Sequence, residues 1–543
     1  MSNATTGSDR VVPGAQPPEQ ERGARLARLA RPVATHWQFS VAVAAAIAVR
    51  VIVILGYPPI LWFTDSYNYI YDAIKHVPDE IRPNGYPFFL DLLLPLHNWF
   101  PVALLQAAMG VVMGVAIYAL LRHRGLPWWG ATLPALPVLF DSYELHLEHM
   151  VTADTLFTFL VTIAVVILCW RDRPPVWVMA VAGLFIGYAA VVRSVGEPLL
   201  VVVLAGMLAR RAGWRRLLTL AVAGLIPVGG YMIWFHSIYG KYTLTESLGP
   251  FLYSRVSTFA ECPKMNVPAD LRFLCDQVKP QDRPAAGDYI WADNDLPPNT
   301  YTPLYNKFGA DVNLRFAPVI NVQTKKFAER AIEAQPVAYA RVVTKDILHT
   351  FGWNRQPDPD NWAGNGPVFR FVSGPEMTAQ IPWYATPRQL YGHPAGYFCD
   401  AKCQSGDDQA RLIQLAEGDF AGKGLGFTRA VQPWERLLEK YQRYVYLPGT
   451  LLGVIVLIGA AGIAARWRRW GGLVLLPWLV GVLLIVLPPM TAGFSYRYVL
   501  AAVPCACLAA GLAFAGRPGA ASVRALAADL RRHLGRGVAV DQE

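Results

Sequence analysis

The chain has 543 residues, of which 54% are hydrophobic and 16% are charged. Charged side chains make up about a quarter of an average soluble protein, and a mean hydropathy of +0.28 is too apolar for a soluble enzyme and too low for a protein that lies wholly in a membrane. The ten excess positive charges fit a nucleic-acid partner, an anionic membrane surface, or the Lys and Arg bias of cytoplasmic loops. The composition excludes a disordered chain, a collagen-like repeat and a small disulfide scaffold.

The first 36 residues are rich in Pro, Gly, Glu and Arg. They predict a disordered cytoplasmic arm. The arm is too long and polar for the start of a signal peptide, and no Ala-x-Ala cleavage site follows the first apolar stretch, so we expect no cleaved signal.

Long apolar stretches predict about ten membrane spans, since a spanning helix needs about 20 apolar residues. The predicted spans, of which the third and the sixth are short, are 38–58, 101–121, 127–140, 150–170, 176–192, 197–209, 216–236, 446–465, 471–489 and 497–515. Every connection that this count places inside contains arginine, as the positive-inside rule requires. These arginines are Arg122, Arg124, Arg171, Arg173, Arg210, Arg211, Arg215, Arg216, Arg466, Arg468 and Arg469. We therefore expect a multi-pass protein of the plasma membrane, with a composition typical of bacteria and both termini in the cytoplasm.

This pattern divides the chain into five parts. They are a cytoplasmic arm (1–36), a module with seven spans (37–236), an extracytoplasmic domain of mixed secondary structure (237–440), three further spans (441–516) and a basic cytoplasmic tail (517–543). The fold class is thus a polytopic α-helical membrane protein with a large outer domain.

Four of the seven cysteines, namely Cys262, Cys275, Cys399 and Cys403, fall in the predicted outer domain. An even number in an oxidising compartment favours two disulfides, and proximity in the sequence favours Cys262–Cys275 and Cys399–Cys403 among three possible pairings. Free buried thiols are the alternative. The chain has no nucleotide-binding loop, no His-Glu-x-x-His and no basic stripe with interleaved aromatics, so nothing indicates nucleotide or nucleic-acid binding.

Asp65 directly follows the first span and precedes Tyr67, Ile70, Tyr71 and Ile74, whose spacing predicts a short helix lying along the membrane surface. The simplest alternative is that Asp65 or Thr64 only caps this helix.

The second outer connection concentrates acidic residues and histidines at the mouth of the bundle, namely Asp141, Glu144, His146, Glu148, His149 and Asp154. Charged groups at membrane depth are costly, and those that remain are usually functional or paired. Asp154 stands out because the apolar span has already begun around it. If a divalent metal ion is bound, Asp154 and His149 are its candidate ligands.

Arg193 and Arg497 lie at outer boundaries of spans, against the positive-inside bias. One explanation for both arginines is that their side chains extend to the lipid headgroups. For Arg193, an ion pair with Glu197 is a second explanation. The alternative is phosphate binding, because a guanidinium group holds phosphate with two hydrogen bonds.

With these residues in place, the chain resembles the GT-C superfamily of membrane glycosyltransferases, including protein mannosyltransferases and aminoarabinose transferases. The similarity rests on Thr64-Asp65-Ser66 after the first span, Gly85-Tyr-Pro, Thr152-Ala-Asp154 and Ser495-Tyr-Arg497-Tyr498. It covers the membrane part, about residues 38–236 and 446–515, and not the outer domain.

The resemblance implies an inverting transfer of a sugar from a polyprenyl-phosphate donor to an acceptor hydroxyl of a protein, lipid or glycan, on the outer face of the membrane. It implies that Asp65 is the catalytic base or orients the acceptor. Where the family commonly has Glu as the second acidic residue, this chain has Asp154, with Glu148 nearby. The donor phosphate would contact Arg497 and Arg193, and Tyr498 and Arg82 complete the candidate substrate-binding residues.

Three other functions remain open. A lipid or sugar transporter or flippase would use the same charged groups to pass ions or headgroups, although no repeated half is visible. An oligosaccharide ligase or polymerase would also use outer arginines. A non-catalytic membrane protein of the cell envelope would bind glycan with its outer domain.

Overall fold

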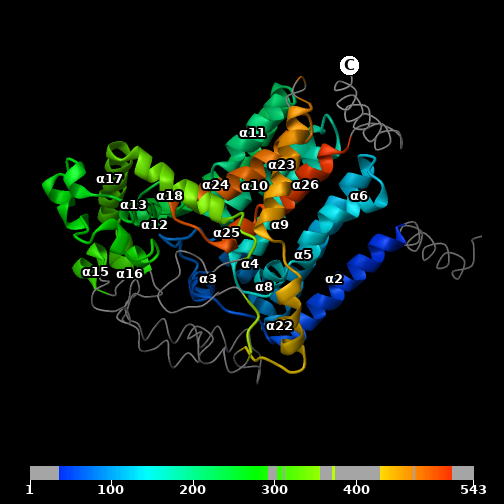
Figure 1. Ribbon diagram of the computed structural model, residues 1–543, viewed down its shortest axis with the longest axis horizontal. Helices are drawn as coiled ribbons and strands as arrows, with labels where there is room; N and C mark the ends of the chain where they lie inside the picture. Colours follow the sequence, from blue (N-terminus) through cyan, green and yellow to red (C-terminus); the bar gives the residue numbers. More distant parts are fainter. Residues whose placement is uncertain are drawn as a thin grey trace, which may run out of the picture.

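The computed structural model describes residues 36–291, 302–309, 312–354, 370–373, 428–466, 468 and 471–515. Within these ranges the regular structure is helical, apart from one parallel β-bridge between Leu61 and Met150. Figure 1 shows a helical bundle and, beside it, a smaller lobe that contains α13 to α18.

The bundle combines an N-terminal and a C-terminal part of the chain. Its N-terminal helices are α2 (Trp37–Gly56), α3 (Thr64–Lys75), α4 (Gly85–Leu93), η1 (Leu94–Leu96), α5 (Phe100–His123), α6 (Trp128–Thr132), η2 (Leu133–Ala135), α7 (Leu136–Phe140), α8 (Ser142–Glu148), α9 (Ala153–Trp170), α10 (Val176–Val192), η3 (Ser194–Gly196), α11 (Leu199–Ala209) and α12 (Trp214–Tyr239). Its C-terminal helices are α22 (Trp434–Tyr444), α23 (Gly449–Ala464), α24 (Leu475–Thr491), α25 (Tyr496–Leu500) and α26 (Val503–Ala513).

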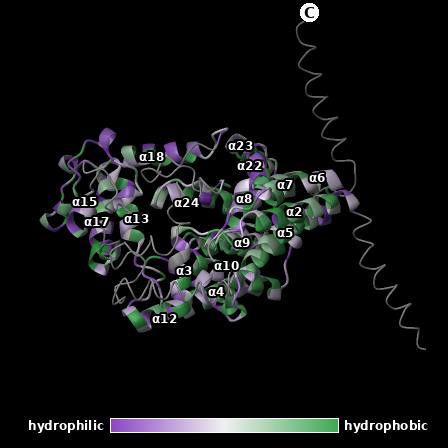
Figure 2. Cartoon of the chain, turned by 90° about the horizontal axis from the view of Figure 1, so that it is seen from below, coloured by the Kyte–Doolittle hydropathy of each residue, from purple (hydrophilic) through white to green (hydrophobic). Residues whose placement is uncertain are grey.

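Five helices in the described ranges are long and apolar enough to cross a membrane: Trp37–Gly56, Phe100–His123, Ala153–Trp170, Trp214–Tyr239 and Tyr496–Ala513. The pair α22 and α23, bent by 53°, adds a sixth candidate, and shorter apolar helices account for the rest. All ten predicted segments coincide with helices, and Figure 2 shows apolar residues concentrated on α2, α5, α9 and α10. The chain is therefore a helical membrane protein, whereas the count of ten crossings stays a prediction.

Helices α10 and α12 pack closely because both carry glycine at their contact. A Cβ atom added at Gly183 would lie 2.5 Å from the Leu220 carbonyl oxygen, and one added at Gly187 would lie 2.0 Å from the Gly224 carbonyl oxygen. Lipid tails are as apolar as leucine, so helices in a membrane associate through close packing of small residues. The spacing Gly-x-x-x-Gly on α10 is this kind of contact.

Arginines in the connections predicted to face the cytoplasm donate hydrogen bonds to carbonyl groups at the ends of neighbouring helices. Arg124 donates to the Cys169 carbonyl near the end of α9, and Arg466 donates to the Ala513 carbonyl at the end of α26. Arg210 likewise reaches the Leu168 carbonyl at 2.9 Å. The last carbonyls of a helix have no partner within it and carry partial negative charge, so these guanidinium groups satisfy and stabilise them.

The smaller lobe has a hydrophobic core of its own. Its helices are α13 (Leu248–Ser257), η4 (Cys262–Lys264), η5 (Ala269–Leu274), η6 (Pro280–Asp282), α14 (Asp288–Trp291), α15 (Pro303–Phe308), α16 (Val312–Phe316), α17 (Pro318–Ala334) and α18 (Pro336–His349). Tyr253, Phe327 and Leu304 are among the buried residues at its centre. A buried ion pair of 2.7 Å between Arg255 and Asp346 joins α13 to α18.

One of the two predicted disulfides is present. Cys262 and Cys275 are bonded and connect the two ends of the η4 to η5 segment. Cys399 and Cys403 lie outside the described residues, as do most of the predicted N-terminal arm and the basic tail.

We predict that Gly187→Ala lowers the apparent melting temperature of the detergent-purified protein, because its new methyl group would displace the α12 backbone at a cost of about 1–3 kcal/mol. Gly230→Ala on α12 is the matched control, since a Cβ atom there meets nothing within 4 Å. The control is expected to be neutral or slightly stabilising. Equal melting temperatures for the two variants would contradict the close contact between α10 and α12.

Candidate active site

Two carboxylates and three arginines from distant parts of the chain form one network of ion pairs. Asp65 accepts a hydrogen bond from Arg82 at 2.7 Å and another from Arg497 at 2.8 Å. Arg497 also donates to Asp154 at 2.7 Å, and Arg193 donates to the second oxygen of Asp154. Because Arg497 contacts both carboxylates, it joins the first turns of α3 and α9.

The network is buried, and it pairs three guanidinium groups with two carboxylates. Asp65 is 8% exposed and Asp154 is 4% exposed. Burial on its own would raise the pKa of Asp65, but the charges of Arg82 and Arg497 outweigh burial and hold the pKa below its usual value. Asp65 is therefore ionised at neutral pH, and all four carboxylate oxygens of the network face guanidinium groups.

The position of Asp65 follows from the segment that connects α2 to α3. The Leu61 amide donates to the His149 carbonyl at 2.8 Å, and the Val151 amide donates to the Leu61 carbonyl at 3.0 Å. The Ser66 hydroxyl then donates to the Val151 carbonyl and accepts from the Phe63 amide. These bonds attach the start of α3 to the residues just before α9, which brings Asp65 close to Asp154.

A glutamine inside the second predicted span holds the other side of this junction. Gln106 of α5 donates to the carbonyls of Glu148 and Met150 at 2.9 and 2.8 Å, and its own carbonyl accepts from the Tyr86 hydroxyl at 2.7 Å. A buried side-chain amide in a membrane protein must find such partners. The three bonds fix the chain immediately before Asp154.

The arginines reach the site from helix ends. Arg193 follows the last residue of α10, and Arg497 lies in α25, after the chain leaves α24 near Pro488 and Pro489. Arg82 comes from the connection between α3 and α4.

Each guanidinium group of the network also lies over an aromatic ring. Arg82 lies 5.5 Å from the centre of the Trp291 ring in the smaller lobe. Arg193 lies 5.2 Å from the Tyr498 ring, and Arg497 lies 5.1 Å from the Phe63 ring. Such contacts stabilise a desolvated cation and restrict its orientation. Through Trp291, the smaller lobe meets the edge of the site.

The structure brings together five of the residues singled out in the sequence as substrate-binding or catalytic, and Tyr498 packs against one of them. Glu148 lies apart from the network: it forms a buried double hydrogen bond with Arg50 of α2, 2.7 Å in both contacts. Of the two acidic residues considered for the second position, the geometry therefore favours Asp154.

The candidate metal ligands do not share a site. The His149 ring nitrogen Nε2 lies 2.8 Å from the Tyr57 carbonyl, and both oxygens of Asp154 are paired with arginines. Within the part of the chain that the structure describes, no group of three His, Cys, Asp or Glu side chains has the arrangement of a metal site. The residues proposed for a metal ion do not fit one.

Two alternatives and one expectation from the sequence are corrected. Phe63 is the N-cap of α3, which begins at Thr64, so neither Asp65 nor Thr64 caps it. Helix α3 is packed inside the protein instead of lying on the membrane surface, since Ile70 is fully buried and Tyr71 is 6% exposed. Arg193 pairs with Asp154 and not with Glu197.

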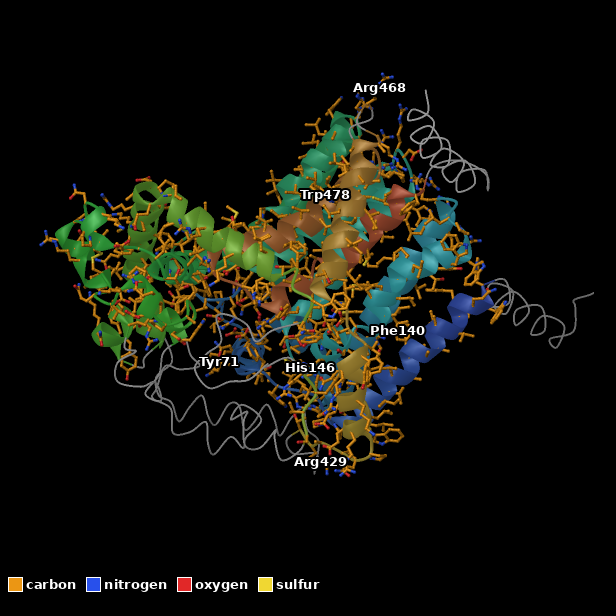
Figure 3. All side chains as sticks on the ribbon, in the orientation of Figure 1. Tyr71, Phe140, His146, Arg429, Arg468 and Trp478 are labelled. Atoms are coloured by element: carbon orange, nitrogen blue, oxygen red, sulfur yellow. A yellow bond between two sulfur atoms is a disulfide. The ribbon has the colours of Figure 1, made fainter. Side chains whose placement is uncertain are left out.

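Figure 3 shows where the site lies in the bundle. The labelled Arg468, in the connection between α23 and α24, lies at the far end of the bundle from the labelled His146 of α8. Helix α8 directly precedes the segment that carries Asp154. Asp154 lies in the first turn of α9 and Arg171 follows its last residue, so the network and the connection that begins with Arg171 lie at opposite ends of this helix.

Sequence reasoning missed Gln106 and Tyr69, which support or border the network, and Arg50, which holds Glu148 away from it. A glutamine and an arginine within predicted spans are a usable signal, because polar groups in a span need partners. Tyr69 carries a weaker signal, its position four residues after Asp65 on the same face of a helix.

Comparisons with known proteins give low similarity. No protein-family model and no curated sequence matches the chain. The structure of the S. cerevisiae protein O-mannosyltransferase Pmt1-Pmt2 complex bound to the sugar donor is similar at 15% identity and a TM-score of 0.30, over 44% of this chain and 37% of that one. The archaeal oligosaccharyltransferase AglB from Archaeoglobus fulgidus, in complex with an inhibitory peptide and a dolichol-phosphate, has 12% identity and a TM-score of 0.36, over 94% and 53%.

A third similar structure is ArnT from Cupriavidus metallidurans bound to undecaprenyl phosphate, with 12% identity and a TM-score of 0.32, over 93% of this chain and 81% of that one. The chain spans little more than a third of the first of these three proteins and about half of the second. At TM-scores of 0.30 to 0.36, these likenesses do not establish the family of this chain.

We predict that Asp154→Asn destabilises the protein by about 3 kcal/mol or more, because it leaves two buried guanidinium groups with one carboxylate fewer. Asp172→Asn is the matched control, because Asp172 also pairs with an arginine, Arg124, but its side chain is 81% exposed. Surface pairs of this kind contribute little. Thermal unfolding of both variants in the same detergent measures the difference, and comparable losses would contradict a network held by buried charge.

Proposed function

We propose that this protein is a GT-C-type membrane glycosyltransferase that transfers a sugar from a polyprenyl-phosphate donor to an acceptor hydroxyl. The observation that carries the proposal is the buried network of Asp65, Asp154, Arg82, Arg193 and Arg497 at one end of an apolar bundle. It combines groups that hold a phosphate with a carboxylate that can accept a proton. A lipid-linked donor is favoured because the network adjoins helices suited to a bilayer.

The arginines supply the phosphate site. Three guanidinium groups face the two carboxylates of the network, and each has further N–H donors that a phosphate could accept. A guanidinium group binds phosphate through two parallel hydrogen bonds, and this interaction is stronger in a buried site than in water. Arg497 is the central group of this site, because it reaches both carboxylates.

Asp65 is the proposed base. The acceptor oxygen attacks the sugar carbon that carries the phosphate and forms a new bond there, while the bond from that carbon to the phosphate oxygen breaks. The phosphate leaves with the electron pair, and the acceptor proton moves to Asp65. Attack from the side opposite to the phosphate inverts the configuration of the sugar carbon.

Both oxygens of Asp65 are engaged with arginines, which lowers its basicity. A phosphate that draws Arg82 or Arg497 toward itself would release one oxygen of Asp65 and weaken the positive field around it. Donor binding would thereby prepare Asp65 to accept a proton, and we expect the donor to bind before the acceptor. Asp154, held by Arg193 and Arg497, keeps these two arginines in place.

The reaction is proposed to take place on the outer side of a bacterial plasma membrane. Asp154 and Arg171 lie at opposite ends of α9, and lysine and arginine concentrate in cytoplasmic loops. In this orientation both termini are cytoplasmic, residues 237–440 are extracytoplasmic, and the disulfide Cys262–Cys275 lies in an oxidising compartment.

The test of the reaction is incubation of the purified protein in liposomes with radiolabelled polyprenyl-phosphate sugars. Covalent transfer of label to an acceptor supports the proposal. Movement of the intact labelled lipid between leaflets, with no transfer, would support a transporter or flippase instead.

Asp65→Asn is expected to reduce transfer by about a hundredfold or more, because general bases contribute rate factors of about 10²–10⁴. Binding of the donor should persist, since all three arginines remain. Asp346→Asn is the control: Asp346 is a buried carboxylate paired with an arginine at 2.7 Å, but it lies in the smaller lobe. If Asp65→Asn turns over at the rate of this control, Asp65 is not the base.

The pH dependence provides a separate check. Asp65 must be ionised, and its pKa is lowered, so kcat/KM should fall only as the pH drops through a value below 3.8. In the complex with donor the arginines face the phosphate, so the acid limb of kcat should move to higher pH. An acid limb of kcat/KM near pH 7 would instead indicate Glu148, whose pKa burial raises to about 7.

A further inference from the structure

Tyr69 lies beside the ion-pair network and has no role in the proposal above. It follows Asp65 by one turn of α3, so the two side chains lie on the same face of the helix. The residue is 4% exposed. Its ring meets the Tyr86 ring edge to face, with the centres 5.1 Å apart.

The ring is held firmly, because its neighbour is itself fixed. The Tyr86 hydroxyl donates to Gln106, which binds the backbone just before Asp154. The Tyr69 ring is thus packed against the same support that positions the second carboxylate.

The hydroxyl of Tyr69, in contrast, has no hydrogen bond to any residue that the structure describes. Other buried or half-buried tyrosines of the bundle use theirs: the hydroxyls of Tyr57, Tyr86, Tyr118, Tyr188, Tyr231 and Tyr441 all have a partner within 3.0 Å. A hydroxyl with no partner among the described residues, in a candidate site, is well placed to bind a ligand.

The charges of the network reach this phenol. Burial and the negative charge of Asp65 raise its pKa, and Arg497, Arg82 and Arg193 act on it in the opposite direction. The phenol is therefore neutral at physiological pH and offers an O–H donor within range of the charges of three guanidinium groups. A donor in a site that contains several arginines suits an anionic oxygen.

We infer that Tyr69 is a donor-binding residue whose hydroxyl donates a hydrogen bond to a phosphate oxygen of the polyprenyl-phosphate donor. This inference rests on the proposed function and adds a neutral donor to the three cationic ones. The hydroxyl supplies what a guanidinium group cannot, a hydrogen bond that leaves the charge balance of the site unchanged.

The test compares the binding of undecaprenyl phosphate, which has no sugar, to the wild type, Tyr69→Phe and Tyr71→Phe in nanodiscs. Tyr69→Phe keeps the ring on Tyr86 and removes only the hydroxyl, so its affinity should fall about tenfold, the usual effect of one hydrogen bond to a charged group. Tyr71 belongs to the same helix and is also buried, but two residues along a helix point to a different face. Tyr71→Phe should therefore bind like the wild type.

Kinetics separates binding from a purely structural role. Tyr69→Phe should raise KM for the donor, leave KM for the acceptor unchanged and melt at the temperature of the wild type. Equal affinity of wild type and Tyr69→Phe for undecaprenyl phosphate would overturn the inference while leaving the proposed function intact, and so would an effect confined to KM for the acceptor. Absence of binding by the wild type would overturn the proposed function and this inference with it.

Discussion

The guanidinium group of Arg497 connects the parts of this protein on which the candidate site depends. It donates to Asp65 in α3 and to Asp154 in α9, which are 89 positions apart in the printed sequence and belong to separate helices. Two buried carboxylates this close would repel each other and lose their hydration without an intervening cation. The network therefore forms only when α25, close to the C-terminal end of the described chain, packs against the first helices of the bundle.

Around this ion-pair centre, neutral polar groups position the backbone. The bridge between Leu61 and Met150 and the amide of Gln106 satisfy backbone groups where helices break off inside the bundle. Irregular backbone at membrane depth is tolerated only where protein groups satisfy it. The same bonds that meet this requirement also set the separation of the two carboxylates, so the stability of the fold and the geometry of the site have a common origin.

Much of the helical framework and most members of the network could be predicted from the sequence, for different reasons. Apolar stretches of the right length locate the helices, because hydrophobicity acts locally along the chain. Asp154, Arg193 and Arg497 stood out because charges at the outer ends of spans are costly. The choice between Asp154 and Glu148 could not be predicted, since both lie close to the predicted start of the fourth span, and only the partner of Glu148, Arg50 of α2, separates them. The surface location expected for α3 was wrong, because an aromatic face that fits a membrane surface equally fits a protein interior.

The sequence by itself determined that this is a membrane protein with apolar helices and with charged groups placed against the usual bias. Both conclusions follow from the free-energy cost of placing each residue in an apolar environment, which can be judged from the residue and its own segment. Tertiary structure alone decided which charges meet, that Arg497 joins two carboxylates, and that the Tyr69 hydroxyl lies beside them without a partner. Contacts between residues hundreds of positions apart depend on how the helices pack, and no local pattern in the sequence contains that information.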